Sequence, residues 1–261
     1  MTLSSSEIEN LRTAKRLLET PGLAAKISSL IGAPIERGFE LLPRKWHLVV
    51  NNATRKSIET ALDVALWTMD HSQAESPSNW WHKLAVGTTG AAGGAFGLAA
   101  LTIELPISTA IMLRSIADIA RSEGENLKMS DARIACVQVL ALGGRSNSDD
   151  RTETGYFAAR AAMAKAVSEA AAHMAGKGLS QKGAPAIVRL IAQIASRFSI
   201  VVSEKAAAQA VPMVGAFGGA LINTLFIDHF QDMGKGHFIV RRLERLHGPE
   251  EVKRIYKELQ A

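Results

Sequence analysis

Residues 84–103 read LAVGTTGAAGGAFGLAALTI and contain no charged side chain over twenty positions. A second charge-free stretch, residues 206–227, reads AAAQAVPMVGAFGGALINTLFI over twenty-two positions. Alanine and leucine enter a helix at little cost, so we expect both stretches to be helical. A helix of twenty residues also has about the length needed to cross a bilayer. These stretches therefore predict two Gly/Ala-rich apolar helical segments, which lie in the core or engage a membrane.

Small residues recur at helical spacing in both stretches. Gly90 and Gly94 are four positions apart, as are Gly215 and Gly219, and Gly97 extends the first set. Residues at this spacing share a helix face, and small ones let two helix backbones approach closely. The sequence Gly-Ala-Phe-Gly occurs in both stretches, at residues 94–97 and 215–218. We expect these glycines to lie where the two helical segments pack together near the centre of the domain.

Three environments remain open for the apolar segments. They are transmembrane spans, a tightly packed helix pair in a soluble core, or helices that are buried in solution and enter a bilayer or a partner on demand. The low content of long aliphatic side chains weakens transfer into lipid. Glu104 and Asp228 lie just beyond the two segments and interrupt them. Composition therefore favours the packed pair over a stable span.

The whole chain has the composition of a helical protein. Of its 261 residues 47 % are apolar and 21 % are charged, which argues against disorder. No run of alternating apolar and polar residues lies between hairpin turns, so no strand is predicted. We expect an all-α fold, a compact multi-helix domain of roughly ten helices. Residues 1–43 are expected to form an N-terminal helical region and residues 44–261 the main helical domain.

Local signals predict the other helix boundaries. Ser6, followed by acidic residues, indicates a helix start. Glu104 is expected to cap a helix that begins at Pro106, and Asp228 to end the second apolar helix. The remaining predicted helices cover residues 23–30, residues 45–69, residues 129–142 before Gly143-Gly144, residues 157–174, residues 185–202 beginning at Pro185, a helix with Ile239, Leu243 and Leu246 on its apolar face, and a last helix after Gly248-Pro249.

Several function classes are excluded or disfavoured. The chain has one cysteine, Cys136, so it can form neither an internal disulfide nor a multi-cysteine metal site, and an apolar context predicts a buried thiol. Motifs of serine hydrolases, P-loop proteins, zinc proteases and dinucleotide-binding folds are absent. The net charge of +5 is mild and contains no long basic run, so we expect no nucleic-acid partner. The N-terminus lacks the features of a signal peptide, which favours a cytoplasmic location.

Two sets of polar residues are candidates for chemistry. Asp228, His229, Asp232 and His237 form a cluster near the end of the second apolar stretch, where a solvated rim is more common than a metal site. Glu104 adjoins the first apolar stretch, where its pKa could be raised by burial. Glu104, Asp228 and His229 are the candidate catalytic residues, and an enzyme requires at least two of them to meet in one cleft. No metal site and no cofactor are predicted.

Other residues are candidates for contact with a membrane or a partner. Trp80 and Trp81 directly precede the first apolar stretch together with Lys83, and Trp and Lys are typical of membrane interfaces. A second candidate group shares one predicted helix face and consists of Arg241, Arg242 and Arg245. Ordinary packing of the tryptophans and solvation of the arginines remain alternatives for both groups.

The chain resembles the EcsC family in three places. These are residues 103–106 (IELP) followed by residues 113–120 (LRSIADIA), residues 211–215 (VPMVG) leading to Asn223, and residues 241–248 (RRLERLHG). The family more often carries Asp at the position of Glu104. The resemblance implies a bacterial, membrane-associated protein of undefined biochemical role, and it brings no established catalytic residues.

Three functions follow as hypotheses. The first is an accessory protein at the cytoplasmic face of the inner membrane, peripherally attached through membrane lipid or a membrane protein. The second is a helical binding protein for a lipid or another apolar ligand, and the third is a membrane-proximal enzyme. The oligomeric state is left open.

Overall fold

Helices account for nearly all of the chain that the computed structural model describes. The described residues are 3–19, 22–31, 35–70, 97–144, 155–177, 184–211 and 219–259. Within them there are ten helices and no strand, which confirms the all-α prediction. The helices are α1 (Ser5–Glu19), α2 (Leu23–Ile31), α3 (Glu36–Leu41), α4 (Trp46–Asp70), α6 (Gly97–Ser122), α7 (Ser130–Leu142), α8 (Gly155–Lys177), α9 (Pro185–Ala210), α11 (Gly219–His247) and α12 (Pro249–Glu258).

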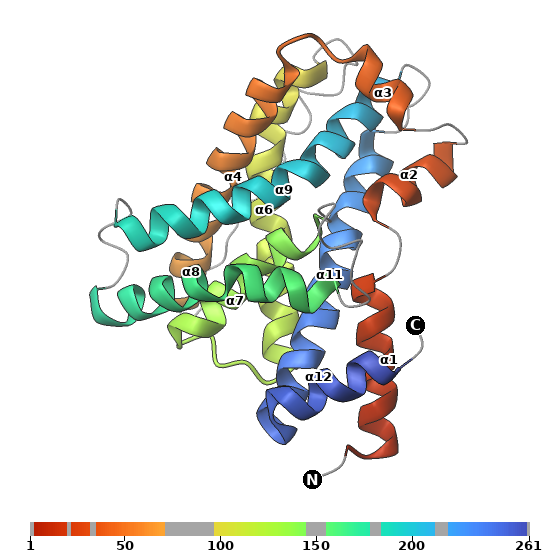
Figure 1. Ribbon diagram of the computed structural model, residues 1–261. Helices are drawn as coiled ribbons and strands as arrows, with labels where there is room; N and C mark the ends of the chain where they lie inside the picture. The colour runs from red at the N-terminus through yellow and green to blue at the C-terminus, as the bar shows by residue number, and fades with distance from the viewer. Residues whose placement is uncertain are drawn as a thin grey trace.

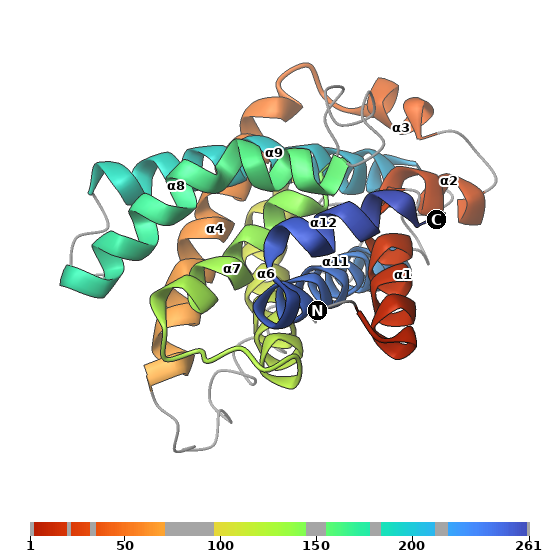
Figure 2. The same cartoon turned by 60° about the horizontal axis from the view of Figure 1, so that its bottom comes forward.

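Long helices surround one short buried helix (Figure 1). α4 and α6 run side by side in the same direction, α9 crosses them, and α11 packs along α6. α8 lies alongside α9, as Figure 2 shows, while α1 packs on α11 and α12 folds back beside it. α7 contacts α6, α8, α9 and α11, and nearly all of its side chains are buried. A helix that is apolar on all sides belongs in a core, and α7 occupies that place.

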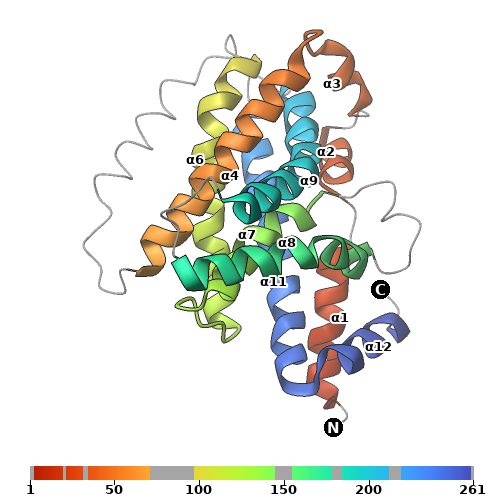
Figure 3. The same cartoon turned by 60° about the vertical axis from the view of Figure 1, so that its left-hand side comes forward.

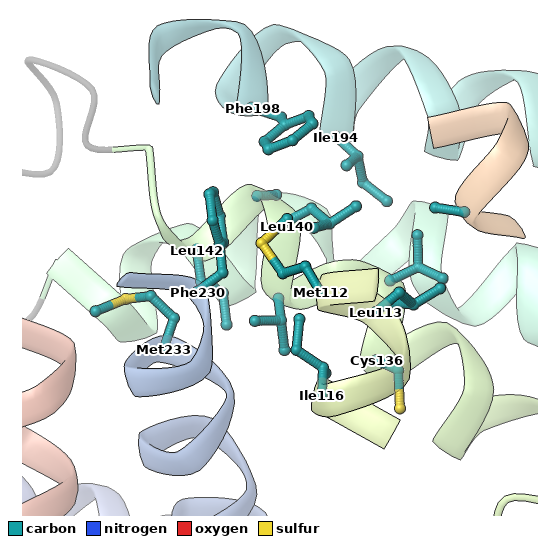
Figure 4. Packing of buried hydrophobic residues seen from close by; sticks show 14 of the residues in the cluster. Met112, Leu113, Ile116, Cys136, Leu140, Leu142, Ile194, Phe198, Phe230 and Met233 are labelled. Atoms are coloured by element: carbon teal, nitrogen blue, oxygen red, sulfur yellow. The ribbon is translucent and has the colours of Figure 1, made fainter. Parts of the chain in front are cut away.

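The core is built where α6, α7, α9 and α11 meet (Figure 4). Met112, Leu140 and Phe198 are fully buried there, and the Phe198 ring packs edge-on against Phe230 with centroids 5.4 Å apart. Cys136 is also fully buried, as predicted, and burial raises the pKa of its thiol to about 12. The thiol therefore acts as a small apolar group.

Two long helices run through positions where the sequence predicts breaks. α6 continues through Glu104 and Pro106, so the prediction that Glu104 caps a helix starting at Pro106 is wrong. α11 continues through Asp228, which was expected to end a helix. Leu105 is fully buried beside Pro106, and α6 packs against α4, α11 and α7. Packing of this kind offsets the roughly 3 kcal/mol that an interior proline costs a helix.

The second apolar stretch is not one continuous helix. α9 ends at Ala210 and α11 begins at Gly219, so residues 206–227 are not one segment. Gly97 and Gly219 begin α6 and α11, two helices that pack together. A Cβ atom at Gly219 would meet nothing within 4 Å, so this glycine is not needed for a close approach. Gly90, Gly94 and Gly215 lie outside the described residues.

Close backbone approaches occur instead at two glycines that were not singled out for packing. A Cβ atom on Gly38 would lie 2.1 Å from the carbonyl oxygen of Ala207, where α3 meets α9. A Cβ atom on Gly144 would lie 2.1 Å from the carbonyl oxygen of Arg197, where the end of α7 meets α9. Arg197 also donates to the carbonyl oxygens of Ala141 and Gly144 at 2.9 and 3.0 Å. These hydrogen bonds satisfy carbonyl groups at the C-terminal end of α7, the end that the double glycine predicts.

Several predicted boundaries agree with the structure, and two details differ. α9 begins at Pro185, α7 ends before Gly143, and α12 begins at Pro249. α1 begins at Ser5 rather than Ser6, because Ser4 and Glu7 form a capping box in which each side chain binds the other's backbone N–H. Leu246, expected on an apolar face, is 62 % exposed. The N-terminal helices pack on the rest of the chain, since α2 and α3 contact α9 and α1 contacts α11. The expected boundary between an N-terminal region and the main domain at residue 43 stays a prediction.

Candidate functional site

Glu104 belongs to a buried ion pair that joins α6 to α9. The Nζ atom of Lys205, which is fully buried, lies 2.7 Å from a carboxylate oxygen of Glu104. The Glu104 side chain is 23 % exposed, so water reaches the pair from the Glu104 side. Gln209, one turn further along α9, donates to the second carboxylate oxygen at 3.5 Å. The carboxylate therefore balances a buried charge and does not cap a helix.

A third helix completes the surroundings of Lys205. Its Nζ atom donates to the Oδ1 atom of Asn223 on α11 at 2.8 Å and lies 4.5 Å from the centroid of the Phe226 ring. Ser108 on α6 donates to the same Asn223 oxygen at 3.2 Å. Burial lowers the pKa of Lys205, and Glu104 opposes part of that effect. With a carboxylate, an amide oxygen and an aromatic face around it, the ammonium is well satisfied.

The other two catalytic candidates lie elsewhere on α11. Asp228 is exposed, whereas His229 is buried and its Nε2 atom lies 3.1 Å from the carbonyl oxygen of Gly143. No hydrogen bond or ion pair within the described residues joins Glu104, Asp228 and His229. That at least two of these three side chains meet in one cleft stays a prediction.

The remaining members of the polar cluster have separate partners. Asp232 forms an ion pair with Lys26 of α2 at 3.0 Å. His237 is fully buried, and its Nδ1 atom lies 2.9 Å from the Tyr156 hydroxyl. Burial, with the positive charges of Arg160 and Arg241, lowers the pKa of His237 well below its ordinary value. Among the residues that the structure describes, no group of three His, Cys, Asp or Glu is arranged to hold a metal ion.

The three arginines of α11 are held by the loop between α6 and α7. Arg241 and Arg245 both bind the carboxylate of Glu125, the closest N–O distances being 2.7 and 2.5 Å. Arg242 lies 2.8 Å from the carboxylate of Glu123. Burial raises the pKa of Glu125, but the hydrogen bonds and charges of the arginines outweigh it and the pKa is lowered. Contact of Arg241, Arg242 and Arg245 with lipid stays a prediction. The other candidates for membrane contact, Trp80, Trp81 and Lys83, lie outside the described residues.

Four large apolar side chains are exposed at one end of the molecule. They are Leu41 at the end of α3, Leu48 in the first turn of α4, Ile103 in the second turn of α6 and Leu221 in the first turn of α11. Their exposed fractions are 54, 51, 63 and 45 %. Figures 1 and 3 show that these helix ends gather at the same end of the bundle. We call this set of four side chains the apolar end.

The turn between α3 and α4 adds basic and aromatic residues to the apolar end. Residues 41–48 read LLPRKWHL, and Arg44 and Lys45 are exposed. Trp46 is half-buried, with its ring centroid 5.7 Å from that of Phe39. Basic and tryptophan residues beside leucines are typical of membrane interfaces. The same combination of Trp and Lys marked residues 80–83 in the sequence, so this signal was present in residues 41–48 and was missed.

A half-open pocket of about 330 Å³ lies between α4 and α9. Asn51 and Thr54 line it from α4, and Val188, Ala192 and Ser199 line it from α9. The ligand-binding hypothesis predicts a cavity between the two glycine-rich helices, whereas this pocket lies between another pair of helices, α4 and α9. That hypothesis stays a prediction.

By length and composition, one helix in the described part of the chain is apolar enough to cross a membrane. It is α9, with a mean hydropathy of 1.5 over its most apolar window. α9 contacts α3, α4, α7 and α8, and 33 % of its most apolar window is buried inside the protein.

Comparison with known proteins gives one result. A family model described as the EcsC protein family matches residues 5–243. No curated protein and no solved structure matches the chain. The match includes the Glu104–Lys205 pair and the apolar end, and it stops before α12.

Proposed function

The chain belongs to the EcsC protein family, and we propose that it is a membrane-associated accessory protein that attaches peripherally to the cytoplasmic face of the inner membrane through its apolar end. The observation that supports this proposal most directly is that helix ends at one end of the bundle carry four exposed apolar side chains, Leu41, Leu48, Ile103 and Leu221. Scattered apolar residues are normal on a protein surface, but exposed apolar residues that gather in one place indicate an interaction site.

The energy available from the apolar end suits reversible attachment. Full burial of an exposed Leu or Ile side chain contributes about 1.5–3 kcal/mol. Four side chains that are about half exposed would therefore contribute about 3–6 kcal/mol on entering lipid. A transmembrane helix of twenty apolar residues would contribute far more, so this surface favours a protein that lies on the membrane.

The partners of two catalytic candidates support a non-enzymatic role. Glu104 is engaged with a buried lysine, and His229 with the backbone at the end of α7. Binding of a lipid or another apolar ligand is a second candidate function, which the pocket between α4 and α9 supports.

Vesicle flotation tests the membrane proposal. The variants Leu41→Ser/Leu48→Ser and Ile103→Ser/Leu221→Ser remove two side chains each from the apolar end. The matched control is Met129→Ser/Leu246→Ser, because these residues are 55 and 62 % exposed but lie beside the start of α7 and at the end of α11. All variants are first compared with the parent protein by circular dichroism.

We expect the parent protein and the control to float with vesicles of phosphatidylcholine and phosphatidylglycerol. Each apolar-end variant should bind about 10- to 100-fold more weakly, because about 1.5–3 kcal/mol of apolar burial is lost. A parent protein that stays with the soluble fraction at every lipid concentration would refute the proposal. Equal losses in the control and in the apolar-end variants would also refute it.

A further inference from the structure

Three cations at the apolar end have no acidic partner within the described residues. They are Arg37 on α3 and Arg44 and Lys45 in the turn that follows, and all three are exposed. The arginines of α11 differ, since Glu123 and Glu125 hold all three of them. A cation without a carboxylate partner can bind a phosphate without first breaking an ion pair.

The local geometry places these cations beside the exposed leucines. Arg37 and Leu41 are four residues apart on α3 and therefore share a helix face. Glu36 and Glu40 are also four apart, so they share the neighbouring face of α3. Leu48 lies three residues beyond Lys45, in the first turn of α4.

The turn is held against the body of the protein by its aromatic residue and by α3. The Trp46 ring packs on Phe39, and Gly38 lies against the backbone of Ala207 on α9. Arg44 and Lys45 thus project from a fixed turn between two exposed leucines, Leu41 and Leu48. A surface of this kind combines apolar insertion with charge, as interfacial membrane segments do.

We infer that Arg44 and Lys45, together with Arg37, bind the phosphate groups of anionic phospholipids, while Leu41 and Leu48 enter the acyl boundary beneath them. This inference rests on the proposed membrane function and adds the class of lipid. Charge complementarity is the argument for the occupant, because a leaflet rich in anionic lipid attracts basic residues next to inserted apolar ones. Two basic residues near such a surface strengthen binding about thirtyfold.

The neighbouring helix α4 offers a control for net charge. Arg55 and Lys56 are exposed on α4 and begin ten residues beyond Lys45, and Arg55 forms an ion pair with Glu59 at 3.0 Å. That separation is about 15 Å along the helix axis, nearly two Debye lengths at physiological salt. Changing Arg55 and Lys56 to Gln removes the same net charge from the protein but leaves the turn intact.

The experiment measures partition of the full chain onto vesicles of phosphatidylcholine with and without phosphatidylglycerol. The parent protein should bind anionic vesicles at least tenfold more tightly than neutral ones. Arg44→Gln/Lys45→Gln should weaken binding to anionic vesicles about thirtyfold and leave binding to neutral vesicles unchanged. Arg55→Gln/Lys56→Gln should stay within about threefold of the parent on both.

The possible outcomes separate this inference from the membrane function on which it rests. Equal binding of the parent to both lipids, with losses only in Leu41→Ser/Leu48→Ser, would overturn the lipid class and leave the membrane function standing. A similar loss in Arg55→Gln/Lys56→Gln would overturn it as well, because net charge would then act without the turn. A parent protein that binds neither vesicle would overturn both proposals.

Discussion

Removal of Glu104 should destabilise the fold more than removal of its partner. We consider Glu104→Leu, Lys205→Met and the double variant. At an effective dielectric constant of 20, unit charges about 3 Å apart attract by about 6 kcal/mol, which offsets the cost of taking the lysine out of water. The Lys205 side chain is fully buried, whereas Glu104 is 23 % exposed.

The difference in exposure determines the expected magnitudes. Glu104→Leu leaves a buried ammonium with the Asn223 oxygen as its hydrogen-bond acceptor, and should lower the free energy of unfolding by about 3–5 kcal/mol. Lys205→Met leaves a carboxylate that water can reach, so we expect a loss of about 1–3 kcal/mol. The double variant should lie within about 2 kcal/mol of the parent, because apolar residues of similar size often replace a buried pair at little cost.

Urea unfolding followed by circular dichroism measures all four proteins as a double-mutant cycle. The pH dependence provides a second measurement. The pKa of Lys205 is lowered in the folded state, so the unfolded chain binds more protons between that pKa and the ordinary value of 10.5. Stability contributed by this group therefore rises with pH through that window, and the window should be wider in Glu104→Leu, which lacks the carboxylate that opposes the shift.

Additive losses in the double variant would refute this reasoning, since they would show that the two side chains act independently. A Lys205→Met variant that is less stable than Glu104→Leu would refute the role assigned to solvent exposure. In either case the contact of α6 with α9 would owe its stability to apolar packing.

Three further predictions concern other parts of the fold. Burial raises the pKa of Glu204 from its ordinary value of 4.5 to about 7. Between pH 4.5 and pH 7 the folded chain therefore binds more protons than the unfolded chain, and the free energy of unfolding should fall as the pH rises through this window. In urea titrations, Glu204→Gln should remove this pH dependence and raise the free energy of unfolding above pH 7 by about 1–3 kcal/mol. An unchanged pH dependence would contradict its assignment to Glu204. Gly144→Ala should cost about 1–3 kcal/mol because its Cβ atom would lie 2.1 Å from the Arg197 carbonyl oxygen. The control is Gly176→Ala in α8, where an added Cβ atom would meet nothing within 4 Å, and it should stabilise the protein by about 0.5–1 kcal/mol. Thermal unfolding measures both variants, and similar losses of stability in Gly144→Ala and Gly176→Ala would argue against overpacking at Gly144. Cys136 should react with a thiol reagent only after unfolding, since burial raises its pKa to about 12, and rapid labelling of the folded protein would disprove that.

Helix positions could largely be predicted from the sequence because the signals are local. Pro185 begins α9 and Pro249 begins α12, since proline fits the first turn of a helix, and Gly248 follows the last residue of α11. The same rules gave the wrong result at Pro106 and Asp228. Both residues lie inside long helices, where packing against neighbouring helices outweighs the local preference of proline or aspartate to end a helix. The local sequence pattern carries no information about the energy of this packing.

The candidate sites were harder to predict because they depend on contacts between distant residues. Lys205 is 101 positions from Glu104, so Glu104 looked like an isolated charge beside an apolar run. Glu125 is 116 positions from Arg241, and the basic face of α11 looked unpaired for the same reason. Leu41 and Leu42 are neighbours of the same type, yet only Leu41 is exposed. Composition identifies apolar residues, whereas the surrounding helices determine which of them reach the surface.

The docking of α12 against α1 has a consequence for how the protein is made. Lys15 donates to the carbonyl oxygens of Tyr256 and Leu259 at 3.1 and 2.5 Å, where α12 ends. Its partners are therefore synthesised 241 and 244 residues later, which at about 5–20 residues per second is roughly 10–50 s. During that time α1 has neither α11 nor α12 to cover its apolar face. A nascent chain of this protein thus exposes Leu11 and Leu18 on the ribosome until α11 and α12 have been made, and chaperones that bind short apolar helices would find their target in α1.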